Sequence, residues 1–367
     1  MTIVPAGQLR LSRRRFSALA ALAPLAAAMP VGGRIAMAQD SLVCTMVTDT
    51  VGLGDQNFND LANNGGTDAA RDFGITWRVV ESQDASAYVP NLVAGAEQGD
   101  LTVAVGALLT DALAEVAPQF PDDWFLLIDS VVDQPNVQSV TFREQESAFL
   151  VGVAAGMFTK TGTIGIVGGM RIPPVIRYEV GFKAGVLAVR PDANFSIAYA
   201  DSFTDPAKGK ELAVAQFNQG ADIVLPIAGL TGVGCYEAVK ERNRLGEEWV
   251  IGADVTQDHL APGFELCVAR KGVDVAVYEG CRQLAEGTFE GGIHDLGLKE
   301  SGVDFQDPND RVPEEIKGYV RAYKQMILDG ALVVPTTDEE FETFSQNLPP
   351  LATPIAAEAT PAATPGA

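Results

Sequence analysis

The hydrophobic positions of this chain form short, nearly continuous runs that are separated by longer segments of helical character. The runs are rich in Val and Ile and do not alternate with polar residues, as is typical of parallel strands covered on both faces. They lie at Leu42–Thr48, Ile75–Glu81, Leu101–Gly106, Trp124–Asp129, Thr163–Val167, Phe195–Ala200, Asp222–Ile227 and Trp249–Asp254. Helices are predicted between them, at Asn57–Arg71, Ser86–Gln98, Gln145–Phe158, Pro174–Val189, Pro206–Gln219 and Gly232–Leu245.

This alternation of strand and helix predicts an α/β fold. About four strand–helix units precede a break near Val137–Arg143, and about four follow it. We therefore expect two doubly wound lobes with a ligand cleft between them. The expected boundaries are 39–142 plus about 274–312 for lobe 1, and 143–273 plus about 313–345 for lobe 2.

The two ends of the chain differ from this pattern. Residues 10–16 read RLSRRRF, an apolar run covers Ala18–Met29, and AMA precedes Gln39. The run is shorter than the roughly 20 residues that span a bilayer, so residues 1–38 are predicted to be a twin-arginine signal peptide. Because no Cys lies at the expected cleavage point, we expect an exported protein that is soluble in the periplasm or outside the cell rather than lipid-anchored. Residues 346–367 are rich in Pro, Ala and Thr and are predicted to be disordered.

Charge and cysteine content narrow the possible partners. The formal charge of −22 becomes −27 when the five arginines of the leader are removed. Such an acidic protein repels nucleic acid and anionic membranes, so neither is an expected partner. Four cysteines without a CxxC pair, and two histidines, do not suggest a metal site. Cys267 and Cys281 are the nearest pair in sequence and can form a disulfide or remain buried thiols.

No catalytic motif stands out. His259 and His294 are the only histidines, and the chain has no G-x-S-x-G, H-E-x-x-H or P-loop sequence. Residues 165–169 read GIVGG, which lacks the lysine and the spacing of a phosphate-binding loop and is better interpreted as a tight turn at a strand end. We therefore expect no catalytic residues, no cofactor and no enzymatic activity.

Polar and aromatic residues recur where the predicted strands end. They are Asp49, Asp111, Phe203, Gly229 and Asp254. Ligands of open α/β sheets bind beyond the carboxyl ends of the strands, so these residues together predict a binding site. For any one of these positions taken alone, a helix cap is the better explanation, and it is their recurrence at several strand ends that favours a site.

Several motifs in order resemble one known family. They are TD at 48–49, GDQNFN at 54–59, VG at 105–106, LTDA at 109–112, ESAFLVG at 146–152, GFKAG at 181–185, FTDPAKG at 203–209, PIAG at 226–229 and GADVTQD at 252–258. From about Val43 to Leu328 the chain resembles the Bmp family of extracytoplasmic solute-binding proteins, the purine-nucleoside-receptor type that serves ABC importers. The resemblance implies a type I periplasmic-binding-protein fold, a monomer, and a membrane permease as partner.

The resemblance also implies roles for individual residues. Phe58 and Phe203 would stack on the two faces of a purine-like ring. Stacking binds the flat face of a ring and does not distinguish the polar groups on the ring's edge. Asn59 and Asp111 would then bind the edge of the ring, while Asp49 lines the site.

In nucleoside-binding relatives, residues at the places of Asp254 and Lys271 hold the ribose hydroxyls.

Structural roles are the alternatives to these ligand-binding roles. Phe58 can pack at the start of a helix, Phe203 can pack between a strand and a helix, and Asp254 can cap a helix. A purine nucleoside and a purine base both remain candidate ligands. An extracellular nucleoside hydrolase, or a sensor component that binds another flat ring such as a flavin, is the alternative function.

Overall fold

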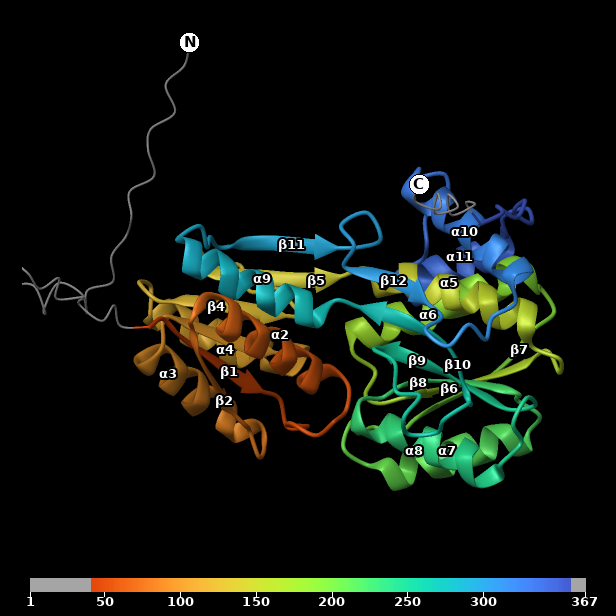
Figure 1. The fold of residues 1–367 in the computed structure, drawn as a ribbon, viewed down its shortest axis with the longest axis horizontal. Coiled ribbons are helices and arrows are strands. Elements are labelled where there is room, and N and C mark those ends of the chain that lie inside the picture. The colour runs from red at the N-terminus through yellow and green to blue at the C-terminus, as the bar shows by residue number, and fades with distance from the viewer. Residues whose placement is uncertain (1–40, 358–367) are drawn as a thin grey trace, which may run out of the picture.

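The computed structural model describes residues 41–357, and in this range the chain forms two sheets of six strands each (Figure 1). Sheet A has the order β11-β5-β4-β3-β1-β2, and all of its strand pairs are parallel. Its strands are β1 (Val43–Thr48), β2 (Thr76–Val80), β3 (Leu101–Val105), β4 (Trp124–Ile128), β5 (Val137–Phe142) and β11 (Gly292–Leu296). The predicted signal peptide lies outside the described residues.

Sheet B repeats this arrangement in the order β12-β10-β9-β8-β6-β7. Only the pair of β12 with β10 is antiparallel. The strands are β6 (Thr163–Gly168), β7 (Asn194–Tyr199), β8 (Ile223–Ile227), β9 (Trp249–Asp254), β10 (Glu265–Lys271) and β12 (Val303–Gln306). The two similar sheets confirm the predicted α/β class.

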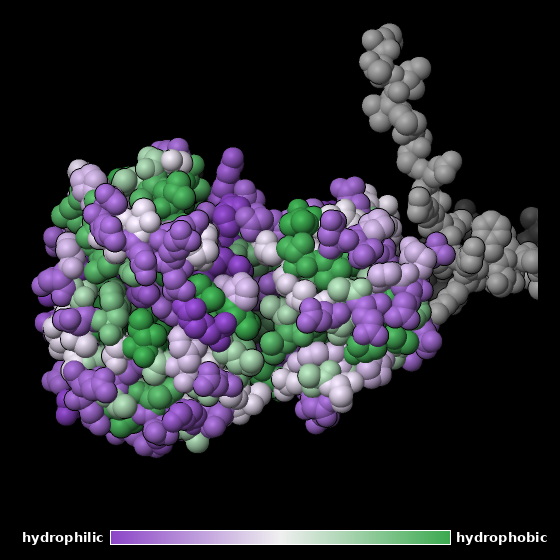
Figure 2. Space-filling model, turned by 180° about the vertical axis from the view of Figure 1, so that it is seen from behind, coloured by the Kyte–Doolittle hydropathy of each residue, from purple (hydrophilic) through white to green (hydrophobic). Residues whose placement is uncertain are grey.

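Helices cover both faces of each sheet, which explains the continuous apolar strands. Over sheet A, α2 packs with α9 on one face and α3 with α4 on the other; over sheet B, the pairs are α5 with α6 and α7 with α8. The helices of lobe 1 are α2 (Phe58–Phe73), α3 (Tyr88–Gln98), α4 (Thr110–Val116) and α9 (Val273–Glu286). Those of lobe 2 are α5 (Glu144–Phe158), α6 (Pro173–Val189), α7 (Pro206–Asn218), α8 (Leu230–Arg242), α10 (Glu314–Leu328) and α11 (Asp338–Gln346). Figure 2 shows the two lobes from behind, with hydrophilic and hydrophobic residues mixed over this face.

The chain passes between the lobes three times: from β5 to α5, from β10 to α9, and from β11 to β12. The third crossing corrects the predicted boundary at residue 312. β12 belongs to sheet B because it pairs with β10 in the register Val268↔Gln306. Arg143 joins two crossings, since its guanidinium contacts Asp295 at 2.9 Å and Glu146 at 2.8 Å.

The C-terminal segment corrects the tail prediction in part. Residues 347–357 contain no helix or strand, but they lie against α10. The Ile355 N–H donates to the Gly318 carbonyl at 3.0 Å, and the Arg321 guanidinium donates to the Ile355 carbonyl at 2.7 Å. These hydrogen bonds fix residues of a segment that forms no helix or strand. Residues 358–367 of the predicted tail lie outside the described range. Within residues 41–357, no helix combines the length and the apolar character needed to cross a membrane.

Candidate ligand-binding site

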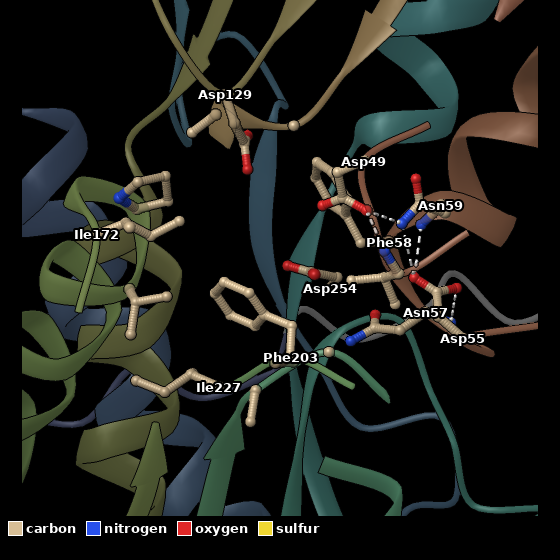
Figure 3. Close-up of a pocket in the computed structure, with 18 of the residues that line it drawn as sticks. Asp49, Asp55, Asn57, Phe58, Asn59, Asp129, Ile172, Phe203, Ile227 and Asp254 are labelled. Carbon is tan, nitrogen blue, oxygen red and sulfur yellow. Dashed lines mark hydrogen bonds between the residues drawn. The ribbon is translucent and has the colours of Figure 1, made fainter. Parts of the chain in front are cut away.

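A cavity lies between the two lobes, at the carboxyl ends of the strands of both sheets (Figure 3). It contains about 660 Å³ of space outside the protein atoms, including its open mouth, which suits a small solute. It is lined by Asp49, Val51, Asp55, Asn57, Phe58, Asn59, Gly106, Ala107, Leu108, Asp129, Ile172, Pro174, Val175, Tyr178, Phe203, Ile227, Ala228, Gly229, Ala253, Asp254 and Lys271.

Each lobe contributes one aromatic ring to this cavity. Phe58 is the first residue of α2 in lobe 1, and Phe203 lies in the loop between β7 and α7 of lobe 2. A glycine makes room for the Phe203 ring. A Cβ on Gly169 would lie 2.3 Å from two ring carbons of Phe203, whereas a Cβ on Gly106 would lie 3.6 Å from Phe58 Cε1, an ordinary van der Waals contact.

We expect Gly169→Ala to weaken ligand binding by displacing the Phe203 ring. Its Cβ would be far inside van der Waals contact, so either the ring or the backbone must move. Calorimetry with adenosine, a compound of the class that the resemblance implies, should show a loss close to that of Phe203→Ala. The control is the double variant: adding Gly169→Ala to Phe203→Ala should cost nothing more, because neighbouring sites are non-additive. An additive loss would mean that Gly169 acts elsewhere.

The loop between β1 and α2 is fixed by its own carboxylates. Asp55 accepts hydrogen bonds from the N–H groups of Asn57, Asn59 and Asp60 at 3.0, 2.8 and 3.1 Å. Asp49 accepts from Asn59 Nδ2 at 3.0 Å. These bonds rigidly hold the start of α2, which carries Phe58.

This side of the cavity is rich in hydrogen-bond acceptors. The buried Oδ1 atoms of Asn57 and Asn59 have no hydrogen-bond partner within the protein. Burial raises the pKa of Asp49 to about 6, although hydrogen bonds from Val51 and Asn59 oppose the rise. Unpaired buried acceptors are costly, so this wall favours a ligand whose edge presents N–H donors.

A buried charge cluster lies on the hinge side of the cavity. The Lys271 ammonium contacts Asp129 Oδ2 at 2.6 Å and Glu144 Oε1 at 3.0 Å. Glu144 also pairs with Arg177 at 2.6 Å, and its side chain is fully buried. Burial alone would lower the pKa of Lys271, but the carboxylates of Asp129, Glu144 and Asp254 raise it above its usual value. Lys271 therefore remains a charged donor at the point where the second crossing begins.

Asp254 ends β9 and turns into the cavity. It has φ +64° and accepts a hydrogen bond from the Tyr178 hydroxyl at 2.6 Å. Burial raises its pKa, while Lys271 opposes that rise. No helix begins here, because the next element is β10. The cap interpretation of Asp254 is therefore wrong.

The structure brings together seven of the eight residues that the sequence proposed. Asp49, Phe58, Asn59, Phe203, Gly229, Asp254 and Lys271 all line the cavity. Asp111 does not: it is an exposed residue in the first turn of α4, so its expected contact with a ring edge is wrong. The alternative explanation of Asp111, a role at a helix terminus, agrees with its position, because an acidic side chain is favourable at the positive N-terminal end of a helix.

The sequence analysis missed five polar residues, of which Asp55, in the loop before α2, lines the cavity and holds that loop. Asp129 follows β4 and was detectable by the same strand-end rule that found Asp49. Asn57 precedes Phe58 and lines the same wall. Tyr178 of α6 lines the cavity, and Glu144 at the start of α5 contacts the lining residue Lys271. Neither spacing nor composition distinguishes these two residues from ordinary surface or core positions.

The cysteines and acidic residues do not form a second kind of site. Cys267 lies on β10 of sheet B and Cys281 on α9 over sheet A; both are free and fully buried, so the disulfide considered from sequence does not form. In residues 41–357, no group of three or more His, Cys, Asp or Glu side chains is arranged to hold a metal ion.

Comparison with known proteins decides the family. Residues 42–338 match the Bmp family model, described as ABC transporter substrate-binding protein PnrA-like. This chain belongs to the Bmp family. Its relatives include the ABC transporter nucleoside-binding protein BmpA of Lactococcus lactis, which is 34% identical over 88% of this chain and 99% of the relative.

Solved structures agree with this assignment. An ABC transporter solute-binding protein from Aeropyrum pernix superposes with a TM-score of 0.77 at 31% identity, covering 84% of this chain and 97% of that one. A sugar transporter structure from Clostridium phytofermentans, at 15% identity and a TM-score of 0.56, shares the fold alone. This Bmp-family chain is thus a substrate-binding protein of ABC transport with the periplasmic-binding-protein fold, and such proteins act outside the cytoplasm.

One expectation conflicts with the relatives. A Pyrococcus horikoshii protein that is 35% identical over 83% of this chain is named a lipoprotein, as is a Pyrococcus abyssi protein that is 33% identical. The expectation of a protein without a lipid anchor therefore disagrees with these names. The first cysteine of this chain is Cys44, inside β1 and fully buried.

Proposed function

We propose that this Bmp-family protein binds a purine nucleoside, or the free purine base, in the cleft between its lobes and delivers it to the permease of an ABC importer. The observation that carries this is the pair Phe58 and Phe203, one ring from each lobe, in a cavity that also holds buried polar groups. Two aromatic faces on opposite lobes suit a flat ring, and stacking contributes about 1–3 kcal/mol per base in nucleic-acid systems.

The charges of the cavity favour a nucleoside over its phosphates. Asp49, Asp129 and Asp254 line the cavity, and Lys271, its one lining cation, already contacts two carboxylates. A phosphate would face these acids without a free cation. Neutral ribose hydroxyls, in contrast, can donate to Asp254 and accept from Lys271.

A hydrolase is the second candidate from another class, and the cavity offers it little support. His259 and His294, the two histidines, are not among the lining residues. We therefore propose a binding protein without enzymatic activity. That it is a monomer remains an expectation. Incubation with adenosine followed by chromatography tests this: release of adenine at a rate proportional to protein would contradict it.

A thermal-shift screen of nucleosides, bases, riboflavin, sugars and amino acids tests the ligand class. A ligand at 100 times its Kd stabilises the folded state by about 2.7 kcal/mol. We expect purine nucleosides to give the largest shifts. Stabilisation by sugars or amino acids alone would refute the proposal, and a response to riboflavin alone would favour the flavin alternative.

Binding of adenosine should weaken as the pH falls below about 6. Burial raises the pKa of Asp49 to about 6, and its carboxylate accepts a hydrogen bond from the ring more strongly than the neutral acid does. At pH 5 about nine-tenths of such a group is protonated, so the Kd should rise by up to about tenfold relative to pH 7.5. The free energy of unfolding depends on pH in the opposite direction. Because the pKa of Asp49 is higher in the folded state than in the unfolded state, Asp49 stabilises the folded protein below about pH 4, and this contribution is lost as the pH rises through 6.

Calorimetry at pH 5.0 and 7.5 measures the binding effect. Asp49→Asn is the control, because an amide at this position does not titrate. Asp129, whose pKa burial also raises to about 6, titrates in the same range, so Asp49→Asn should reduce the pH dependence without necessarily removing it. An unchanged slope in Asp49→Asn would show that Asp49 does not bind the ring.

A further inference from the structure

Gln56 has an unusual backbone conformation at the rim of the cleft. Its φ is +55°, in the left-handed region that side-chain-bearing residues other than Asn, Asp and His adopt infrequently. Such a conformation persists only where the surroundings hold it, and it often marks a functional position. Gln56 lies in the loop between β1 and α2, directly before Asn57 and Phe58 of the cavity wall.

Lobe 1 holds this loop from one side. The Gln56 N–H donates to Asp60 Oδ2 at 2.9 Å, and the Gly54 N–H donates to Asp60 Oδ1 at 2.9 Å. These bonds orient the carbonyl and the side chain of Gln56 without occupying them.

Lobe 2 contacts the backbone carbonyl and the side-chain oxygen of Gln56. Gln257 Nε2 donates to the Gln56 carbonyl at 3.1 Å, and His259 Nε2 lies 2.8 Å from Gln56 Oε1. Both partners follow β9 in lobe 2, whereas Gln56 precedes α2 in lobe 1. These hydrogen bonds therefore join the lobes across the mouth of the cleft.

The lobe 2 side of this contact is firmly anchored. Gln257 is 3% exposed, and its N–H donates to Glu265 Oε2 at 2.8 Å. Glu265 in turn accepts from the Tyr236 hydroxyl at 2.8 Å. When the lobes move apart, Gln257 and His259 must move with lobe 2 and leave Gln56.

We infer that Gln56 is a positioning residue, which latches the closed cleft and couples closure to the placement of Phe58. With the lobes together, Gln257 and His259 hold Gln56 in its left-handed conformation. With the lobes apart, the residue loses both contacts and can relax, which changes the direction of the chain leading into Phe58. The inference requires only that the cleft opens and closes, whatever the ligand.

Single-molecule FRET on the ligand-free protein tests the latch directly. Dyes are attached through Gln83→Cys in lobe 1 and Glu211→Cys in lobe 2, both exposed positions; the native cysteines are fully buried. Gln257→Ala and His259→Ala should each reduce the ratio of closed to open molecules by about 2- to 12-fold, the equivalent of one neutral hydrogen bond. The opening rate should rise and the closing rate should stay unchanged.

Matched variants separate the latch from general damage. Gln56→Ala keeps the carbonyl and the strained backbone and loses only the His259 contact, so it should reproduce His259→Ala and show no further loss when combined with it. Gln56→Gly also loses this contact but accepts a positive φ, so it should lose less than Gln56→Ala. His294→Ala, on β11, should behave like the wild type. Unchanged opening rates in Gln257→Ala and His259→Ala would overturn the inference, as would a wild type with no closed population.

Stopped-flow binding of adenosine tests the link to Phe58. In Gln56→Ala the dissociation rate should rise while the association rate is unchanged, and Phe58→Ala should then cost less than in the wild type. Equal costs in both backgrounds would contradict the positioning role. If the wild-type protein binds neither a purine nucleoside nor a purine base, the proposed function fails, while the FRET result still decides the latch.

Discussion

Lys271→Met should lower the free energy of unfolding by about 3–5 kcal/mol, the usual cost of removing one partner from a buried ion pair. Lys271 is 2% exposed and contacts Asp129 and Glu144 at the hinge. Without the ammonium, two carboxylates remain buried beside each other. Urea unfolding of the ligand-free protein measures the change.

Lys208→Met is the matched control for this substitution. Lys208 pairs with Glu211 at 3.1 Å on the surface, where both side chains are well exposed, and such pairs contribute about 0–1 kcal/mol. Adding Asp129→Asn to Lys271→Met should restore part of the lost stability by removing one unpaired charge. If the two lysine variants unfold alike, the buried cluster does not stabilise the hinge.

Asp254→Ala should weaken adenosine binding strongly and adenine binding little. Ribose hydroxyls would lose a charged acceptor, which contributes about 1.5–3 kcal/mol, or roughly 10- to 150-fold in Kd. Phe58→Ala should weaken both ligands by about 1–3 kcal/mol, because a lost stack affects the ring in either form. Calorimetry with the two ligands measures the four affinities.

Tyr178→Phe is the control for Asp254. It removes the 2.6 Å hydrogen bond to Asp254 but leaves the carboxylate in the cavity. If Asp254 binds the hydroxyls directly, Tyr178→Phe should lose much less adenosine affinity than Asp254→Ala does. Equal losses of adenosine and adenine in Asp254→Ala would assign Asp254 a structural role instead.

The fold was predictable because its signals are local. Continuous Val- and Ile-rich strands that alternate with helical segments predict covered parallel sheets, and both sheets have this form. β12 was assigned to the wrong lobe because Val303–Gln306 is short, and its pairing with β10 depends on a third crossing. The sequence near residue 300 carries no mark of that crossing.

The site was predictable where it follows strand ends and family motifs. Asp49 and Phe203 lie beyond β1 and β7, where ligands of open sheets bind. The prediction for Asp111 was wrong because this residue lies one helical turn beyond β3, after Ala107–Leu109. Its side chain therefore reaches solvent instead of the cavity. Glu144 was missed because its contacts with Lys271 and Arg177 join residues far apart in sequence, which a pattern of neighbours does not reveal.

Titration of adenosine into the wild type and Phe203→Ala by isothermal calorimetry tests the central claim most directly. Binding of a flat purine ring between the two lobes predicts one site per chain in the wild type. It also predicts an affinity about 5- to 150-fold weaker in Phe203→Ala, the equivalent of one lost stack. Undiminished binding in Phe203→Ala, or no heat from adenosine where a sugar or amino acid binds one to one, would contradict it.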